Sequence, residues 1–161
     1  MAVLTVSDTR REESDTGGAL IRELIRKNGH EIADQRLIPD EEALIRQVVH
    51  TWGDDKAIDA IIVTGGTGLA PRDRTYEALA PILDRTIGGF GELFRMLSYQ
   101  EIGPAAMLSR AFAGVVGDTV VFALPGSRNA IALAMTKLIL PEIGHVVSES
   151  RKRSELDEKT A

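Results

Sequence analysis

The sequence has no cysteine, few aromatic residues and no long apolar run. Without cysteine the chain forms no disulfide, zinc finger, iron–sulfur cluster or thiol nucleophile, which fits a reducing cytosol. No apolar run approaches the roughly 18 residues of a membrane span, and the N-terminus lacks a signal-peptide pattern. We therefore expect a soluble, cytoplasmic protein that does not bind a membrane.

The charge balance is acidic, with 19 Lys and Arg against 24 Asp and Glu. A general nucleic-acid binder normally needs a basic face to neutralise phosphates, so nucleic acid is not the expected partner. The 161 residues are 43% hydrophobic, which suits one packed domain rather than disorder. We expect this domain to span residues 1–150, followed by a charged, frayed tail over residues 151–161.

Apolar runs alternate with segments of helical periodicity. The runs predict strands over residues 2–6, 30–38, 58–64, 111–116 and 119–124. Helical periodicity predicts a first helix that begins at residue 15 or 16 and ends at residue 28, and a second that begins after residue 39. Further helices are predicted over residues 76–83, 90–99 and 129–140, and Pro141 is expected to interrupt the segment that follows. This order indicates an α/β fold, a three-layer α/β/α sandwich with a mainly parallel sheet. Ligands of such sheets bind beyond the carboxyl ends of the strands.

The glycine-rich segment Thr64–Gly68 directly follows the most apolar strand. Its glycines allow a ligand to approach the backbone, and successive N–H groups can bind a phosphate. The segment lacks both familiar nucleotide fingerprints, because Pro71 stands where the dinucleotide motif needs glycine and no Gly-Lys-Ser/Thr comes after it. A plain glycine turn is the alternative interpretation.

Two aspartates near predicted strand ends have two interpretations each. Asp73 lies five residues beyond the glycine loop, and Asp40 follows Pro39 at another strand end. Carboxylates beside a phosphate site can hold Mg²⁺, which bridges phosphate oxygens. Either aspartate could instead cap the helix that begins after it.

Ser127 begins the last predicted helix, where it could help to bind an anion or could simply be the cap. Arginines flank the predicted strand ends and would favour an anionic substrate: Arg10, Arg11, Arg72, Arg74 and Arg128. His30, His50 and His145 share no metal-binding spacing.

Five of the seven aromatic residues fall between positions 76 and 112: Tyr76, Phe90, Phe94, Tyr99 and Phe112. They could belong to the core or to a contact between subunits. The segment Phe90–Tyr99 is the candidate subunit surface.

Five ordered motifs together resemble the molybdopterin-binding family of molybdenum cofactor biosynthesis, in its B-type branch. They are residues 2–10, Thr64–Gly68, residues 72–75, residues 89–95 and residues 124–127, and the resemblance covers residues 2 to about 147. It implies a three-layer α/β/α fold, a homo-oligomer (trimer or hexamer) and contact with other proteins of the pathway.

The resemblance also implies an activity, Mg²⁺-dependent transfer of AMP from ATP to the terminal phosphate of molybdopterin with release of pyrophosphate. Gly65, Gly66, Thr67 and Gly68 would then bind the nucleotide phosphates, and Asp40 and Asp73 would be the catalytic, Mg²⁺-associated carboxylates. Ser7 and Asp8, with Pro125, Gly126 and Ser127, would line the pterin and nucleotide pocket.

The sequence departs from the family pattern at two places, with Tyr76 after Thr75 and Arg128 after Ser127, where proline is common. Two other functions remain open. One is a non-catalytic pterin-binding or scaffolding oligomer, and the other is a nucleotide-processing relative that hydrolyses a pyridine or ADP-ribose nucleotide.

Overall fold

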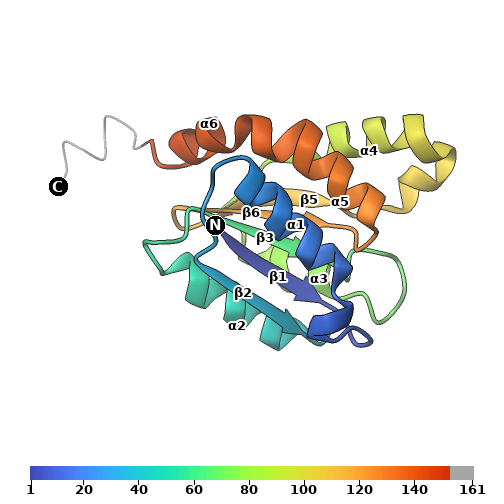
Figure 1. Ribbon diagram of the computed structural model, residues 1–161, viewed down its shortest axis with the longest axis horizontal. Coiled ribbons are helices and arrows are strands. Elements are labelled where there is room, and N and C mark those ends of the chain that lie inside the picture. Colours follow the sequence, from blue (N-terminus) through green and yellow to red (C-terminus); the bar gives the residue numbers. More distant parts are fainter. Residues whose placement is uncertain (153–161) are drawn as a thin grey trace.

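A computed structural model describes residues 1–152 of the chain (Figure 1). The predicted tail of residues 151–161 therefore lies outside the described residues, except for Arg151 and Lys152. Arg151 forms an ion pair with Asp59, 2.6 Å between Nη2 and Oδ1.

The chain alternates strands and helices in the predicted order. The strands are β1 (Ala2–Val6), β2 (Asp34–Ile38), β3 (Ala60–Thr64), β4 (Arg85–Thr86), β5 (Phe112–Val116) and β6 (Thr119–Leu124). The α-helices are α1 (Thr16–Lys27), α2 (Glu42–Gly53), α3 (Thr75–Leu79), α4 (Gly88–Ile102), α5 (Arg128–Ala134) and α6 (Leu140–Ser150). Short 3₁₀ turns η1 (Glu12–Ser14), η2 (Ala80–Ile82) and η3 (Gly103–Leu108) and a π-helical turn η4 (Met135–Ile139) lie between them.

The six strands form one sheet in the order β2-β1-β3-β6-β5-β4. β2, β1, β3 and β6 pair in parallel, whereas β5 is antiparallel to β6 and β4 is antiparallel to β5. The prediction of a mainly parallel sheet in an α/β fold is thus confirmed. The four parallel strands all end at one edge of the sheet, where ligands of such folds bind.

Helices cover both faces of the sheet, as Figure 1 shows, with α1, α4, α5 and α6 on one side and α2 and α3 on the other. Because successive strand residues point to opposite faces, Ile62 of β3 packs under the first group and Ile61 under the second. Both side chains are fully buried. This burial on both faces explains the almost continuously apolar strands.

Two local predictions were wrong, and one strand was not predicted. Strand β2 begins at Asp34 rather than residue 30, and the two-residue strand β4 is too short to leave a signal in the sequence. Pro141 does not interrupt the last helical segment, which runs from Arg128 to Ser150. The proline lies in the first turn of α6, directly after the π-helical turn, where the missing N–H is tolerated because the helical bonding pattern changes.

The helical run Arg128–Ser150 has the length and composition of a membrane-crossing helix, contrary to the expectation that no segment would. The core helix of a sheet-based domain can have the same properties. Here Ile131, Ala134 and Met135 are fully buried in the core cluster that covers the sheet. The apolar composition is therefore accounted for by packing within this fold.

The aromatic segment of α4 divides between two faces of the helix. Phe90 and Phe94 are buried in the core, where Phe90 meets Phe122 edge-on with ring centres 5.2 Å apart. Leu93, Met96 and Tyr99 are about half exposed on the outer face. The core interpretation is thus confirmed for Phe90 and Phe94, whereas the outer face of α4 is exposed.

Candidate functional site

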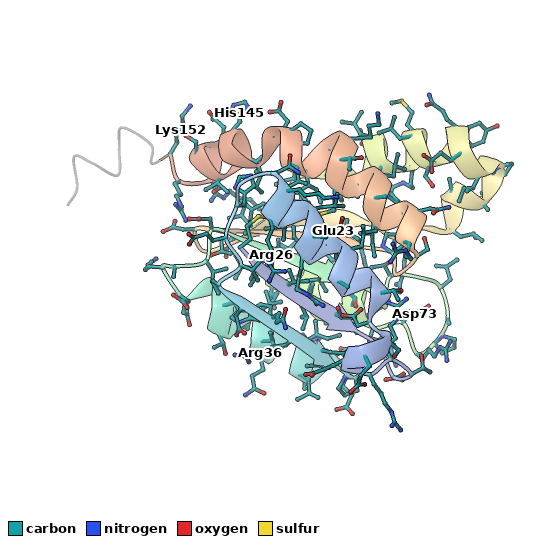
Figure 2. The ribbon with its side chains drawn as sticks, in the orientation of Figure 1. Glu23, Arg26, Arg36, Asp73, His145 and Lys152 are labelled. Carbon is teal, nitrogen blue, oxygen red and sulfur yellow. The ribbon has the colours of Figure 1, made fainter. Side chains whose placement is uncertain are left out.

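A cavity of about 450 Å³ lies at the carboxyl ends of β1, β3 and β6. Figure 2 shows Asp73 at this edge, and His145 and Lys152 at the far end of the molecule. The lining includes every residue proposed for the site except Ser127: Ser7, Asp8, Asp40, Gly65, Gly66, Thr67, Gly68, Asp73, Pro125 and Gly126. Residues from separate parts of the chain therefore meet where the sheet topology places a ligand.

The glycine loop adopts a backbone that other residues cannot follow. Gly65 and Gly66 have φ angles of 101° and 63°. A Cβ atom on Gly65 would collide with the carbonyl oxygen of Val6, and one on Gly66 would lie 2.5 Å from Oδ2 of Asp40. The glycines are thus required both by the left-handed backbone and by the close approach of neighbouring chain segments.

The base of the loop is fixed to neighbouring elements. Thr75 donates from Oγ1 to the carbonyl of Gly65 (2.8 Å). Its backbone N–H donates to the carbonyl of Gly66 (3.0 Å). The backbone N–H of Gly65 donates to the carbonyl of Leu124 (3.0 Å), and Oγ1 of Thr64 donates to the carbonyl of Pro125 (3.2 Å). These bonds tie the loop to α3 and to the end of β6.

Three successive N–H groups of the loop have no hydrogen-bond partner in the described part of the chain. Among residues 1–152, the N–H groups of Gly66, Thr67 and Gly68 make no hydrogen bond to another residue. All three residues line the cavity. Neighbouring unpaired backbone donors form a binding site for an anion such as phosphate, which favours the phosphate-loop interpretation over a plain turn.

Neither aspartate serves as a helix cap. Oδ1 of Asp40 accepts from the backbone N–H of Arg74 (2.9 Å), and α2 begins after Glu41 without a side-chain cap. Oδ2 of Asp73 accepts from the N–H of Ala70 (3.1 Å), and α3 likewise lacks a side-chain cap. Each aspartate therefore orders a loop of the cavity wall.

A third carboxylate, Asp8, joins this pair and affects its ionisation. Oδ1 of Asp8 accepts from the backbone N–H of Asp40 (2.9 Å). Partial burial raises the pKa of Asp40, and the nearby negative charges of Asp73 and Asp8 raise it further. A divalent cation placed among these groups would remove that repulsion.

Among residues 1–152, no group of three or more His, Cys, Asp or Glu side chains is arranged to hold a metal ion by itself. Mg²⁺ commonly uses only one or two protein carboxylates, with phosphate oxygens and water completing its shell. The donors here fit that mode of binding. His30, His50 and His145 lie outside the cavity lining.

Only two of the five predicted arginines, Arg10 and Arg72, line the cavity. Nη2 of Arg10 donates to the carbonyl of Gly126 (2.9 Å), which joins the β1 and β6 loops. Arg128 instead donates to the carbonyl of Thr16 (3.1 Å). The cavity lining thus contains three carboxylates, those of Asp8, Asp40 and Asp73, and two of the five arginines expected near the strand ends.

Ser127 acts as a helix cap. Its Oγ accepts from the N–H of Ala130 (3.3 Å), and the residue is absent from the cavity lining. The cap interpretation therefore describes its side chain better than the binding interpretation. Sequence reasoning missed Thr9, Leu108 and Ser109, which also line the cavity. The last two lie at the end of η3, a segment whose sequence contains no recognisable motif.

Comparison with known proteins supports one family. Residues 2–145 match the family model described as a probable molybdopterin binding domain. The molybdenum cofactor biosynthesis protein B of Bacillus subtilis is 49% identical over 151 residues, which cover 93% of this chain and 89% of that protein.

Similarity to solved structures supports the same family. A crystal structure of a molybdenum cofactor biosynthesis protein B has a TM-score of 0.91 and 46% identity, covering 94% of this chain and 95% of its own. The molybdopterin biosynthesis enzyme MoaB from Thermus thermophilus has a TM-score of 0.80 and 40% identity, covering 92% and 94% of the two chains.

Proposed function

Since the chain belongs to the molybdopterin-binding domain family, which includes molybdenum cofactor biosynthesis protein B, we propose that it adenylylates molybdopterin. In this reaction an oxygen of the terminal phosphate of molybdopterin attacks the α-phosphorus of ATP. A new phosphorus–oxygen bond forms, the bond between the α- and β-phosphates breaks, and pyrophosphate leaves.

The observation that carries this proposal is the set of three unused N–H groups on Gly66, Thr67 and Gly68, close to the carboxylates of Asp40 and Asp73. Transfer between phosphates gathers negative charge, which preorganised donors stabilise. The loop would bind nucleotide phosphates by its backbone, and no protein nucleophile is needed.

Asp40 and Asp73 would hold Mg²⁺, which supplies positive charge to the phosphate oxygens when it is bound. Asp8 keeps the Asp40 backbone in place through its hydrogen bond. Arg72 and Arg10 would contact the anionic substrates from the cavity wall, because both line it. Ser7, Pro125 and Gly126 would form the remaining wall toward the pterin.

The alternative is a protein that binds molybdopterin without turnover, which a comparison of variants separates from the enzyme. We expect Asp73→Asn to lower the rate of adenylyl transfer by about a hundredfold, because a charged group at the phosphates is lost. The matched control is Asp118→Asn, since Asp118 is an exposed carboxylate that pairs with Lys56 outside the cavity.

The measurement is the amount of adenylylated pterin formed by wild-type protein and both variants, together with cofactor production in cells that lack the native gene. A scaffolding role predicts that Asp73→Asn supports cofactor production as well as the wild type does.

We also propose that the protein is a homo-oligomer, a trimer or hexamer, and that it works in the cytoplasm beside other proteins of the pathway. The exposed face of α4 supports a contact between copies, because it presents Leu93, Met96 and Tyr99, continued by Met107 in η3.

Met96→Glu is expected to lower the mass measured by light scattering. Gln47→Glu, an exposed position on α2 across the sheet, is the control. An unchanged mass for Met96→Glu would contradict this choice of surface.

A further inference from the structure

A single arginine outside the cavity lining connects the two ends of the loop that carries the candidate site. Arg110 lies between η3 and β5, and its side chain is 22% exposed. Nε donates to the carbonyl of Gly68 (2.9 Å), and Nη2 donates to the carbonyl of Asp73 (3.0 Å). The guanidinium group therefore closes the segment between the phosphate-binding N–H groups and the candidate metal-binding carboxylate.

Further contacts fix this arginine from two other directions. Its backbone N–H donates to the carbonyl of Thr67 (3.2 Å). Its Nη1 donates to Oε1 of Glu77 in α3, and this hydrogen bond lowers the pKa of Glu77. These two further acceptors belong to the glycine loop and to α3.

Tyr76, the residue that departs from the family pattern, has a place in this arrangement. The guanidinium carbon of Arg110 lies 5.2 Å from the centre of the Tyr76 ring, which in turn meets Phe112 edge-on at 5.1 Å. An arginine over an aromatic face is stabilised by the ring quadrupole and is restricted in its rotamers. Tyr76 thus supports the orientation that lets Arg110 reach Gly68 and Asp73.

We propose that Arg110 is a positioning residue that holds residues 66–74 in the conformation that binds nucleotide phosphate, with Tyr76 as its stacking surface. Arg110 touches no substrate. It acts by keeping the N–H groups of Gly66–Gly68 and the carboxylate of Asp73 at a fixed separation. This inference rests on the proposed function for the identity of the ligand, but not for the ordering of the loop.

Arg110→Met tests the proposal, because it keeps the length of the side chain and removes all its donors. Two charge-assisted hydrogen bonds to the loop are lost, so we expect amide hydrogen exchange over residues 67–75 to become about tenfold faster in the ligand-free protein. The Kd of Mg-ATP, measured by calorimetry, is expected to rise by a similar factor, as is the KM for ATP, with a smaller change in kcat. Arg110→Lys should restore part of each effect.

The matched control is Arg85→Met, since Arg85 also donates to a backbone carbonyl, but that carbonyl is Ser150 in α6 and not part of the loop at the candidate site. It should leave loop exchange and Mg-ATP binding unchanged. If Arg110→Met does not fold, Tyr76→Leu provides the second variant, with faster loop exchange expected than in Tyr76→Phe.

Loop exchange and Mg-ATP affinity that match the wild type in these variants would overturn the proposal. A wild-type protein that binds Mg-ATP but forms no adenylylated pterin would contradict the proposed function and leave the exchange result to decide the role of Arg110.

Discussion

At the scale of single residues, the site depends on glycines and on carboxylates that accept hydrogen bonds from backbone N–H groups. Gly65 and Gly66 allow the β1 and β2 ends to approach the loop, and Asp40 and Asp73 each accept from a backbone N–H. Sequence spacing suggested these residues but left capping open for both aspartates. Their partners, Arg74 and Ala70, show that the choice depends on loop geometry that spacing does not encode.

Gly66→Ala tests the requirement for glycine. The added methyl group would meet Thr75 and lie 2.5 Å from Oδ2 of Asp40, on a backbone with a φ of 63°. We expect the free energy of unfolding to fall by about 1–3 kcal/mol and Mg-ATP binding to weaken. Denaturant unfolding and calorimetry measure the two effects. Gly88→Ala, where a Cβ meets nothing within 4 Å, should show neither.

Asp40→Asn tests the ionisation of the carboxylate cluster. Because the pKa of Asp40 is raised in the folded protein, its contribution favours folding at low pH and is lost as the pH rises through that pKa. In the absence of metal, Asp40→Asn should therefore melt at a higher temperature than the wild type at pH 7.

The difference in melting temperature should shrink as the pH falls and the wild-type carboxyl group becomes neutral. A lower melting temperature for the variant at pH 7 would contradict the assignment. The same variant should bind Mg²⁺ with nucleotide more weakly.

At the scale of secondary-structure elements, α4 shows how one periodic segment serves two purposes. The helical periodicity of residues 90–99 predicted a helix, and α4 confirms it. The spacing did not show which residues face the sheet, because residues on both faces are apolar. Burial separates them, with Phe94 at 1% and Tyr99 at 60% exposure.

Phe94→Ala is expected to lower the free energy of unfolding by about 3–5 kcal/mol, because it opens a cavity under the sheet. Tyr99→Ala removes an exposed ring, and its effect should depend on protein concentration if this face joins two copies. Denaturant unfolding at two protein concentrations distinguishes the variants. A small, concentration-dependent loss in Phe94→Ala would mean that its ring faces a partner rather than the core.

At the scale of the whole molecule, the sequence was sufficient to predict the fold class and the edge of the sheet that carries the site. Apolar runs indicated the buried parallel strands, and motifs at the ends of three of them meet around the cavity. Strand β4, the antiparallel direction of β5 and the contacts of Arg110 were not predictable. They depend on pairings between segments far apart in the chain, for which local periodicity contains no information.

The central claim is that the cavity transfers AMP from ATP to molybdopterin, and product formation tests it most directly. Purified protein is incubated with Mg²⁺, molybdopterin and ATP labelled at the α-phosphate, and both products are quantified. We predict labelled, adenylylated molybdopterin and pyrophosphate in equal amounts. Absence of both products, under conditions in which a known active relative forms them, would contradict this claim.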